Sequence, residues 1–338
     1  MKFKRLIILC CVSLFGFVLS TNKSFSQESY NMLGFELQLE PLMNEMFEAK
    51  NANERFAAND KFLTTMEDAL LFENSFSYHF EKLSKISILT SKDKQFRILT
   101  WAIVNQEGEW ENYGYVQARN AEDGTYEVYR LYDKSDEITD PETQKLDDST
   151  WFGAVYYDLI QTKADNATIY TLLGWDGNNI YSRRKIIEPI SFKRNSGKPI
   201  FGKNIFYKEK DRMRFIFEYS TQTNFTLKYG EQYYEVEGQT KTKSTLFHKA
   251  RPFEVEPPKT AKEKLIFFDL LEPENPSMAG LTQYYVPSGE VVGLKFENNK
   301  WKKIKYNVLP RNAKEQNDDY QPDNTIKHTL FPINKDKK

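Results

Sequence analysis

Two stretches near the start of the chain repeat their apolar residues every three or four positions. The members are Leu39, Leu42, Met43, Met46 and Phe47 in the first stretch and Phe62, Leu63, Met66, Ala69 and Leu70 in the second. This spacing is typical of amphipathic helices that bury one face, and the stripes are interpreted as core rather than as a cofactor pocket. Asn51 lies between the stretches and can cap the second helix, with Glu54 three residues later. The pattern predicts a helical hairpin within residues 27–80.

From residue 81 onward the apolar period changes to two, which is typical of β-strands. The predicted strands are 96–104, 126–132, 151–157, 168–173, 212–219, 225–229, 265–268 and 292–296. Residues 96–104 are apolar on both faces, as in a central strand. In 212–219 the apolar Phe215 and Phe217 alternate with the polar Arg214 and Glu218.

Turn-forming residues separate these runs, for example at 123–124 and 288–289, and no long helical pattern lies between them. About ten to fourteen strands are expected on this spacing. The predicted fold class is therefore mainly β (α+β). The helical hairpin is followed, over residues 81–306, by a mostly antiparallel, multi-stranded sandwich or barrel-like body.

Three segments lack this patterning. Residues 133–149 are rich in charged and small polar residues and are interpreted as an exposed loop. Residues 251–264 contain three prolines and predict a possible boundary between sub-domains. Residues 307–338 are rich in Asn, Asp and Lys, which predicts a flexible tail.

The first 26 residues have the order of a cleavable signal peptide. A basic start is followed by an uncharged run over residues 6–19, and Ser24 and Ser26 occupy the positions that signal peptidase requires. The run falls short of the roughly 20 apolar residues that a membrane-spanning helix needs. Cys10 and Cys11, the only two cysteines, lie inside it. The sequence therefore predicts export to the periplasm or outer surface, with no transmembrane segment after cleavage and no thiol chemistry or disulfide in the body.

The charge balance argues against a polyanionic partner. The chain has 47 basic and 48 acidic residues, and the leader holds only basic ones, so the remaining body is mildly acidic. Nucleic-acid binding is therefore not expected. Aromatic residues make up 15% of the chain, a share that suits packed strands and also surfaces that stack on sugar rings.

Motifs for metal, cofactor or nucleophilic chemistry are not found. His79, His248 and His328 have no second ligand at metal-binding spacing. The chain contains no Gly-Xaa-Ser-Xaa-Gly motif and no phosphate-binding glycine loop, so neither a metal nor a cofactor is expected. Residues 176–179 (Asp-Gly-Asn-Asn) are interpreted as a hairpin turn rather than a calcium loop, because Ile180 and Tyr181 follow where ligands would be needed.

Five residues remain as candidates for a site. Glu188 and Asp269 each follow an apolar run, where burial can raise the pKa of a carboxyl and suit it to general acid catalysis. Trp110, Trp175 and Trp301 lie near turns among polar residues and are candidates for ligand binding. For each of the five, a structural role is the competing interpretation.

Several blocks of the sequence, at 96–116, 170–192, 198–206, 212–220 and 284–296, resemble a set of uncharacterised exported proteins of Gram-negative bacteria. That resemblance implies export and a β-rich fold and supplies no catalytic residue. The favoured hypothesis is a non-enzymatic cell-envelope module that binds a partner protein or a glycan through its loops. The alternative is a glycan-directed hydrolase that uses paired carboxylates, with Glu188 and Asp269 as the candidates.

Overall fold

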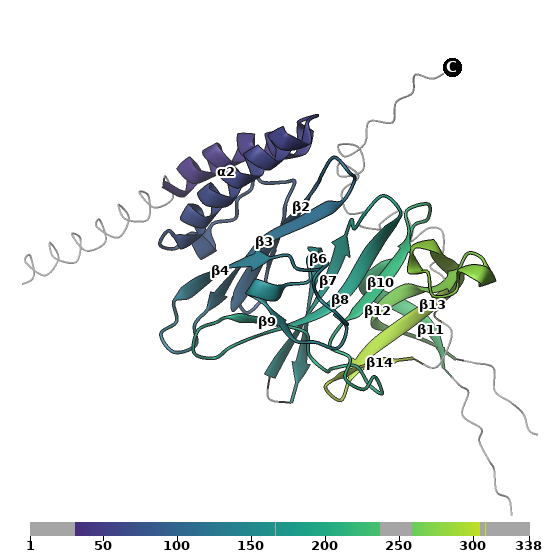
Figure 1. Ribbon diagram of the computed structural model, residues 1–338. Helices are drawn as coiled ribbons and strands as arrows, with labels where there is room; N and C mark the ends of the chain where they lie inside the picture. Colours follow the sequence, from purple (N-terminus) through teal and green to yellow (C-terminus); the bar gives the residue numbers. More distant parts are fainter. Residues whose placement is uncertain (1–30, 166, 237–258, 305–307, 309–338) are drawn as a thin grey trace, which may run out of the picture.

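The computed structural model describes residues 31–165, 167–236, 259–304 and 308 (Figure 1). The predicted signal peptide, residues 251–258 of the predicted boundary and all of the predicted tail except Val308 lie outside the described residues. No helix in the described ranges combines the length and the apolar character needed to cross a membrane.

The predicted helical hairpin is confirmed. A first helix covers residues 31–48 and α2 covers Ala52–Leu71, followed by a short 3-10 helix, η1 (Ser75–Ser77). Asn51 is the N-cap of α2, and its side chain accepts a hydrogen bond from the backbone N–H of Asn53 at 2.8 Å. Leu39 of the first helix and Phe62 of α2 are fully buried, so the predicted stripes form one core.

The rest of the described chain forms three antiparallel sheets, as the fold-class prediction requires. The first sheet has the order β1 (Ser87–Thr90), β2 (Phe96–Val104), β3 (Trp110–Arg119), β4 (Tyr126–Tyr132). The middle sheet has the order β5 (Leu146–Asp147), β9 (Pro199–Phe201), β8 (Ser182–Phe192), β7 (Ala167–Asp176), β6 (Val155–Ala164), and β10 (Phe215–Ser220) also pairs with β8. The third sheet has the order β11 (Leu227–Val236), β12 (Lys259–Pro273), β13 (Tyr285–Glu297), β14 (Lys300–Lys303).

These elements stack as four layers, with the helices on the first sheet and the middle sheet between the first and the third (Figure 1). In β2, Trp101 packs toward the helices, whereas Ile98 packs toward the middle sheet. In β8, Ile186 faces the first sheet and Ile187 faces the third. The continuous apolar run of β2 therefore reflects burial on both faces, as predicted.

The central strand β8 was not predicted, because charged residues and a proline interrupt its apolar pattern. It pairs with β10 as far as Ile187 and with β9 from Ile190 onward. Pro189, which has no N–H to donate, lies where β8 changes partner, and there it costs no ladder hydrogen bond on that side.

One of the unpatterned segments differs from the prediction. The segment 133–149 is not simply exposed, because it contains β5 and the start of the 3-10 helix η2 (Asp148–Thr150), and Leu146 is buried against the middle sheet. In the predicted boundary 251–264, residues from Lys259 onward belong to β12. Two further 3-10 helices, η3 (Pro276–Met278) and η4 (Thr282–Tyr284), connect β12 to β13.

Candidate functional site

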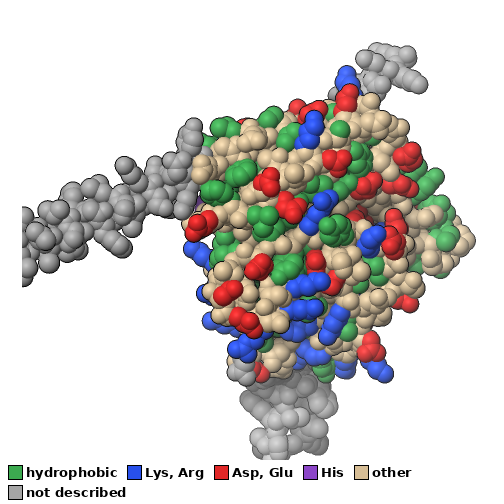
Figure 2. Space-filling view, turned by 60° about the vertical axis from the view of Figure 1, so that its left-hand side comes forward, with side chains coloured by type: hydrophobic (Ala, Val, Ile, Leu, Met, Phe, Trp, Pro, Cys, Tyr) green, Lys and Arg blue, Asp and Glu red, His purple; other side chains and the backbone are tan. Residues whose placement is uncertain are grey.

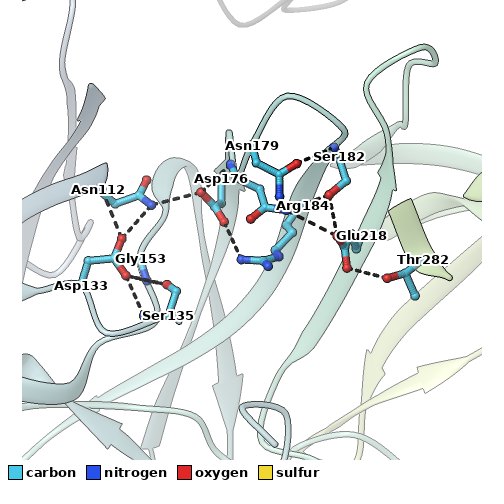
Figure 3. A network of polar contacts seen from close by, with 11 residues as sticks. Asn112, Asp133, Ser135, Gly153, Asp176, Asn179, Ser182, Arg184, Glu218 and Thr282 are labelled. Atoms are coloured by element: carbon cyan, nitrogen blue, oxygen red, sulfur yellow. Dashed lines mark hydrogen bonds and ion pairs between the residues drawn. The ribbon is translucent and has the colours of Figure 1, made fainter. Parts of the chain in front are cut away.

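A row of charged side chains crosses the face of the middle sheet that is turned toward the first sheet. Arg184 of β8 lies directly opposite Asp176 of β7 on one side and Glu218 of β10 on the other. Directly opposed residues of paired strands project from the same face. The three side chains therefore lie side by side at the end of the sheet, as Figure 3 shows.

A pocket of about 440 Å³ opens next to this row. Its walls come from the segment that follows β4, from β8 and β10, and from η4. The lining residues are Ser135, Ile138, Asp140, Pro141, Glu142, Thr143, Phe152, Arg184, Ile216, Glu218 and Thr282. The pocket thus combines apolar side chains with hydroxyls, carboxylates and one guanidinium group.

Arg184 is held at the pocket wall from behind. Its Nη1 lies 3.2 Å from Oδ2 of Asp176, and its guanidinium carbon lies 5.7 Å from the centre of the Phe152 ring. The Arg184 side chain is 20% exposed, whereas that of Asp176 is only 3% exposed. Burial raises the pKa of Asp176 to about 6, although the positive charge of Arg184 opposes this shift.

Asp176 belongs to a network that ties the first sheet to the middle one (Figure 3). Asn112 of β3 donates from Nδ2 both to Asp176 Oδ1, at 3.1 Å, and to Asp133 Oδ2, at 2.9 Å. Asp133 in turn accepts hydrogen bonds from Ser135, which lines the pocket, and from the backbone N–H of Gly153. A Cβ atom on Gly153 would lie 2.1 Å from Asp133, so only glycine fits there. The network fixes the segment that forms the pocket wall.

Of the three carboxylates that line the pocket, those of Glu142 and Glu218 are fixed by hydrogen bonds. Glu142 Oε1 accepts from the backbone N–H of Ile216 at 3.0 Å and pairs with Arg212 Nη1 at 2.5 Å. Glu218 accepts from the hydroxyls of Ser182 and Thr282, one on each carboxylate oxygen. Both carboxylates therefore have defined positions before any ligand arrives.

Glu188 lies on the same face of β8 but not in the pocket. Its carboxylate accepts two bonds from Arg214 Nε, at 3.0 and 2.8 Å, and both side chains are 0% exposed. Arg214 donates its remaining nitrogens to the carbonyls of Pro141 and Phe201. Burial raises the pKa of Glu188 to about 7, as its sequence position suggested, but the carboxylate has no access to a ligand.

Asp269 belongs to the third sheet and is not brought near Glu188. Its Oδ2 accepts a hydrogen bond from the backbone N–H of Thr226 at 2.7 Å, which joins the start of β11 to the bulge in β12. The third sheet packs on one face of the middle sheet. Glu188 projects from the other face, toward the first sheet. These two acids therefore do not form the pair that glycan hydrolysis requires.

The three candidate tryptophans divide into two groups. Trp301 is 1% exposed and donates from Nε1 to the Thr171 hydroxyl at 3.1 Å, so it joins the third sheet to the middle sheet inside the core. Trp110 and Trp175 are half-buried and meet edge to face, with ring centroids 5.2 Å apart. Trp110 also covers Gly177, directly after Asp176, where a Cβ atom would lie 2.3 Å from the indole. This pair therefore borders the polar network.

The pocket residues were largely missed by the sequence analysis. The alternation predicted over residues 212–219 did place Arg214 and Glu218 on one face, and the structure confirms this. Residues 176–179 do form the turn between β7 and β8, as interpreted, with Asn178 at a positive φ of 50°. The polar segment after β4 was not recognised as part of a pocket, because an irregular loop has no periodic pattern of apolar residues.

In the described part of the chain, no group of three or more His, Cys, Asp or Glu side chains is placed to hold a metal ion. His248 and His328 lie outside the described residues. Neither a family model nor a curated protein matches the chain. The functional argument therefore depends on the pocket and the groups that line it.

Proposed function

We propose that this protein is an exported cell-envelope module that binds a glycan, non-enzymatically, in the pocket lined by Arg184, Glu142 and Glu218. The observation that carries the proposal is a set of hydrogen-bond donors and acceptors that are already held in position beside apolar lining residues. Ligand pockets typically combine apolar walls with a few polar groups that set orientation.

The chemistry of the lining favours a ligand with many hydroxyl groups. The carboxylates of Glu142 and Glu218 only accept hydrogen bonds, and the guanidinium of Arg184 only donates them. The hydroxyls of Thr143 and Thr282 already donate to the Asp140 carbonyl and to Glu218, so toward a ligand they accept hydrogen bonds. A sugar hydroxyl donates one hydrogen bond and accepts others, so a saccharide can satisfy all three kinds of group at once.

Charge supports recognition at short range rather than long-range attraction. On the face in Figure 2, acidic and basic side chains are mixed with hydrophobic ones. Within the pocket, Arg184 is paired with Asp176 and Glu142 with Arg212. A surface of mixed charge does not steer a highly charged ligand from a distance. The proposed export depends on the N-terminal leader described above.

The test is a binding screen on the mature protein with fragments of peptidoglycan and of neutral polysaccharides, followed by calorimetry on each hit. We expect at least one saccharide to bind, and we expect Arg184→Ala and Glu218→Gln each to weaken binding at least tenfold. A change of this size corresponds to about 1.4 kcal/mol. Each substitution removes a group that the ligand would contact directly.

Matched control variants are Arg194→Ala and Glu290→Gln, which change exposed residues that do not line the pocket. Both should bind as the unaltered protein does. Equal affinity in the pocket variants and the controls would place the binding elsewhere. Shortening of a bound saccharide during the assay would replace the binding proposal by the hydrolase alternative, with Glu142 and Glu218 as its carboxylates.

A further inference from the structure

The ion pair behind the pocket has one buried partner and one partner at the pocket. Asp176 is almost completely buried, whereas Arg184 reaches the pocket wall and keeps a fifth of its side chain exposed. A change in the charge of Asp176 would therefore act on Arg184 without direct contact between Asp176 and a ligand.

Several groups face Asp176 from the surrounding elements. Arg184 approaches from β8, the Asn112 amide from β3 and the backbone N–H of Asn178 from the following turn. The negative charge of Asp133, beyond Asn112, raises the pKa of Asp176, as burial does. The pKa of the Tyr219 hydroxyl on β10 is raised mainly by burial, and the negative charge of Asp176 adds to this shift. Arg184 supplies the positive charge that favours ionised Asp176, and on its other side Arg184 lies opposite the carboxylate of Glu218 on β10.

We propose that Asp176 is a positioning residue for Arg184 and makes the pocket sensitive to pH: ionised Asp176 holds the guanidinium at the pocket wall, and protonated Asp176 releases it. The predicted effect of pH on ligand binding rests on the proposed function. The release of Arg184 itself can be observed without any ligand.

The consequence for the ligand has a definite direction. Burial brings the pKa of Asp176 to about 6, so the carboxylate is charged at pH 8 and mostly neutral at pH 5. At pH 5 the ionic part of the contact between Asp176 and Arg184 is lost, and the partly exposed guanidinium gains hydration by moving toward solvent. Ligand affinity is therefore higher at pH 8 than at pH 5.

The test uses the mature protein and two readouts at pH 5 and pH 8. The first is the NMR spectrum of the arginine guanidinium groups, with the Arg184 signals assigned from Arg184→Lys. A held guanidinium gives separate Nη signals because its rotation is slow, and a released one gives averaged signals. We expect separate signals at pH 8, averaged signals at pH 5, and averaged signals at both values in Asp176→Asn.

The second readout is the Kd of the saccharide that binds most tightly in the screen. We expect the Kd to rise at least tenfold from pH 8 to pH 5 in the unaltered protein, and less than twofold in Asp176→Asn. The matched control is Asp158→Asn, which removes a half-buried carboxyl whose pKa is also raised by burial, on the edge strand β6 and outside the pocket lining. This control should keep the full pH dependence.

The two readouts distinguish a failure of the positioning role of Asp176 from a failure of the proposed function. Arg184 signals that stay separate at pH 5, or that remain separate at pH 8 in Asp176→Asn, would overturn the positioning role. If no saccharide binds, the proposed function fails, and the guanidinium spectra still decide whether Asp176 controls Arg184.

Discussion

The same face of the middle sheet carries two arginine–carboxylate pairs in different surroundings. The Glu188–Arg214 pair is fully enclosed, and the two Nη nitrogens of Arg214 donate to backbone carbonyls. Asp176–Arg184 is enclosed on the carboxylate side only, and its arginine lines the pocket. Arg184 and Glu188 are only four residues apart on one strand, so their local sequence is almost shared.

The difference shows that enclosure, rather than residue type, separates a structural pair from one that can act on a ligand. Arg214 joins the segment after β4 to β8 and β9, and the pair leaves no room for another molecule. Arg184 keeps donor capacity at the pocket because only Nη1 is used by Asp176. Substitutions in the two pairs should therefore affect different properties.

The largest expected effect is on stability, from Arg214→Met. This change leaves the Glu188 carboxylate buried without its partner, which typically costs about 3–5 kcal/mol. Urea unfolding followed by circular dichroism measures the free energy of unfolding directly. We expect a loss in that range, or failure to fold at 37 °C.

The double variant Glu188→Leu/Arg214→Met is the matched control, because replacing both members of a buried pair by apolar residues is often nearly neutral. It should recover most of the lost stability. A single variant as stable as the unaltered protein would mean that the pair is not enclosed as described.

A smaller loss of stability is expected for Arg184→Met, about 1–2 kcal/mol, because hydrogen bonds to charged groups contribute in this range and the side chain is partly screened by water. Asp176 keeps its bonds from Asn112 and Asn178 after the change. The same variant should lose saccharide binding. A variant that is destabilised as much as Arg214→Met would contradict the distinction between the two pairs.

The sequence predicted the helices and several strands correctly because those features depend on local periodicity. The stripe around Phe62, the cap at Asn51 and the two-sided strand 96–104 each follow from residues adjacent in the chain. The same reasoning marked Glu188 as a buried acid with a raised pKa.

The site was not predictable in the same way, because its contacts join segments far apart in the sequence. In the sequence, Arg184 is one charged residue within a charged run. Only the strand register shows that it lies between Asp176 and Glu218. Trp301 was a candidate for ligand binding because its neighbours Lys300 and Lys302 are polar, with a structural role as the competing interpretation. Its side chain points inward, which fits the structural role. In a strand, polar neighbours say nothing about the face on which a residue lies.

The smallest effect is the pH dependence of stability. The pKa values of Asp176 and Glu188 are raised by burial, to about 6 and about 7, above their ordinary values of 3.8 and 4.5. At pH values between the ordinary pKa and the raised pKa of each group, the folded protein binds more protons than the unfolded chain. The free energy of unfolding therefore falls as pH rises. We expect the free energy of unfolding to decrease from pH 5 to pH 8 at constant ionic strength. Asp176→Asn should remove the part of the slope near pH 6 and leave the part near pH 7, which belongs to the enclosed pair. A slope near pH 6 that is the same in Asp176→Asn would mean that the carboxyl at the pocket does not titrate there, and would leave the two pairs alike in this respect.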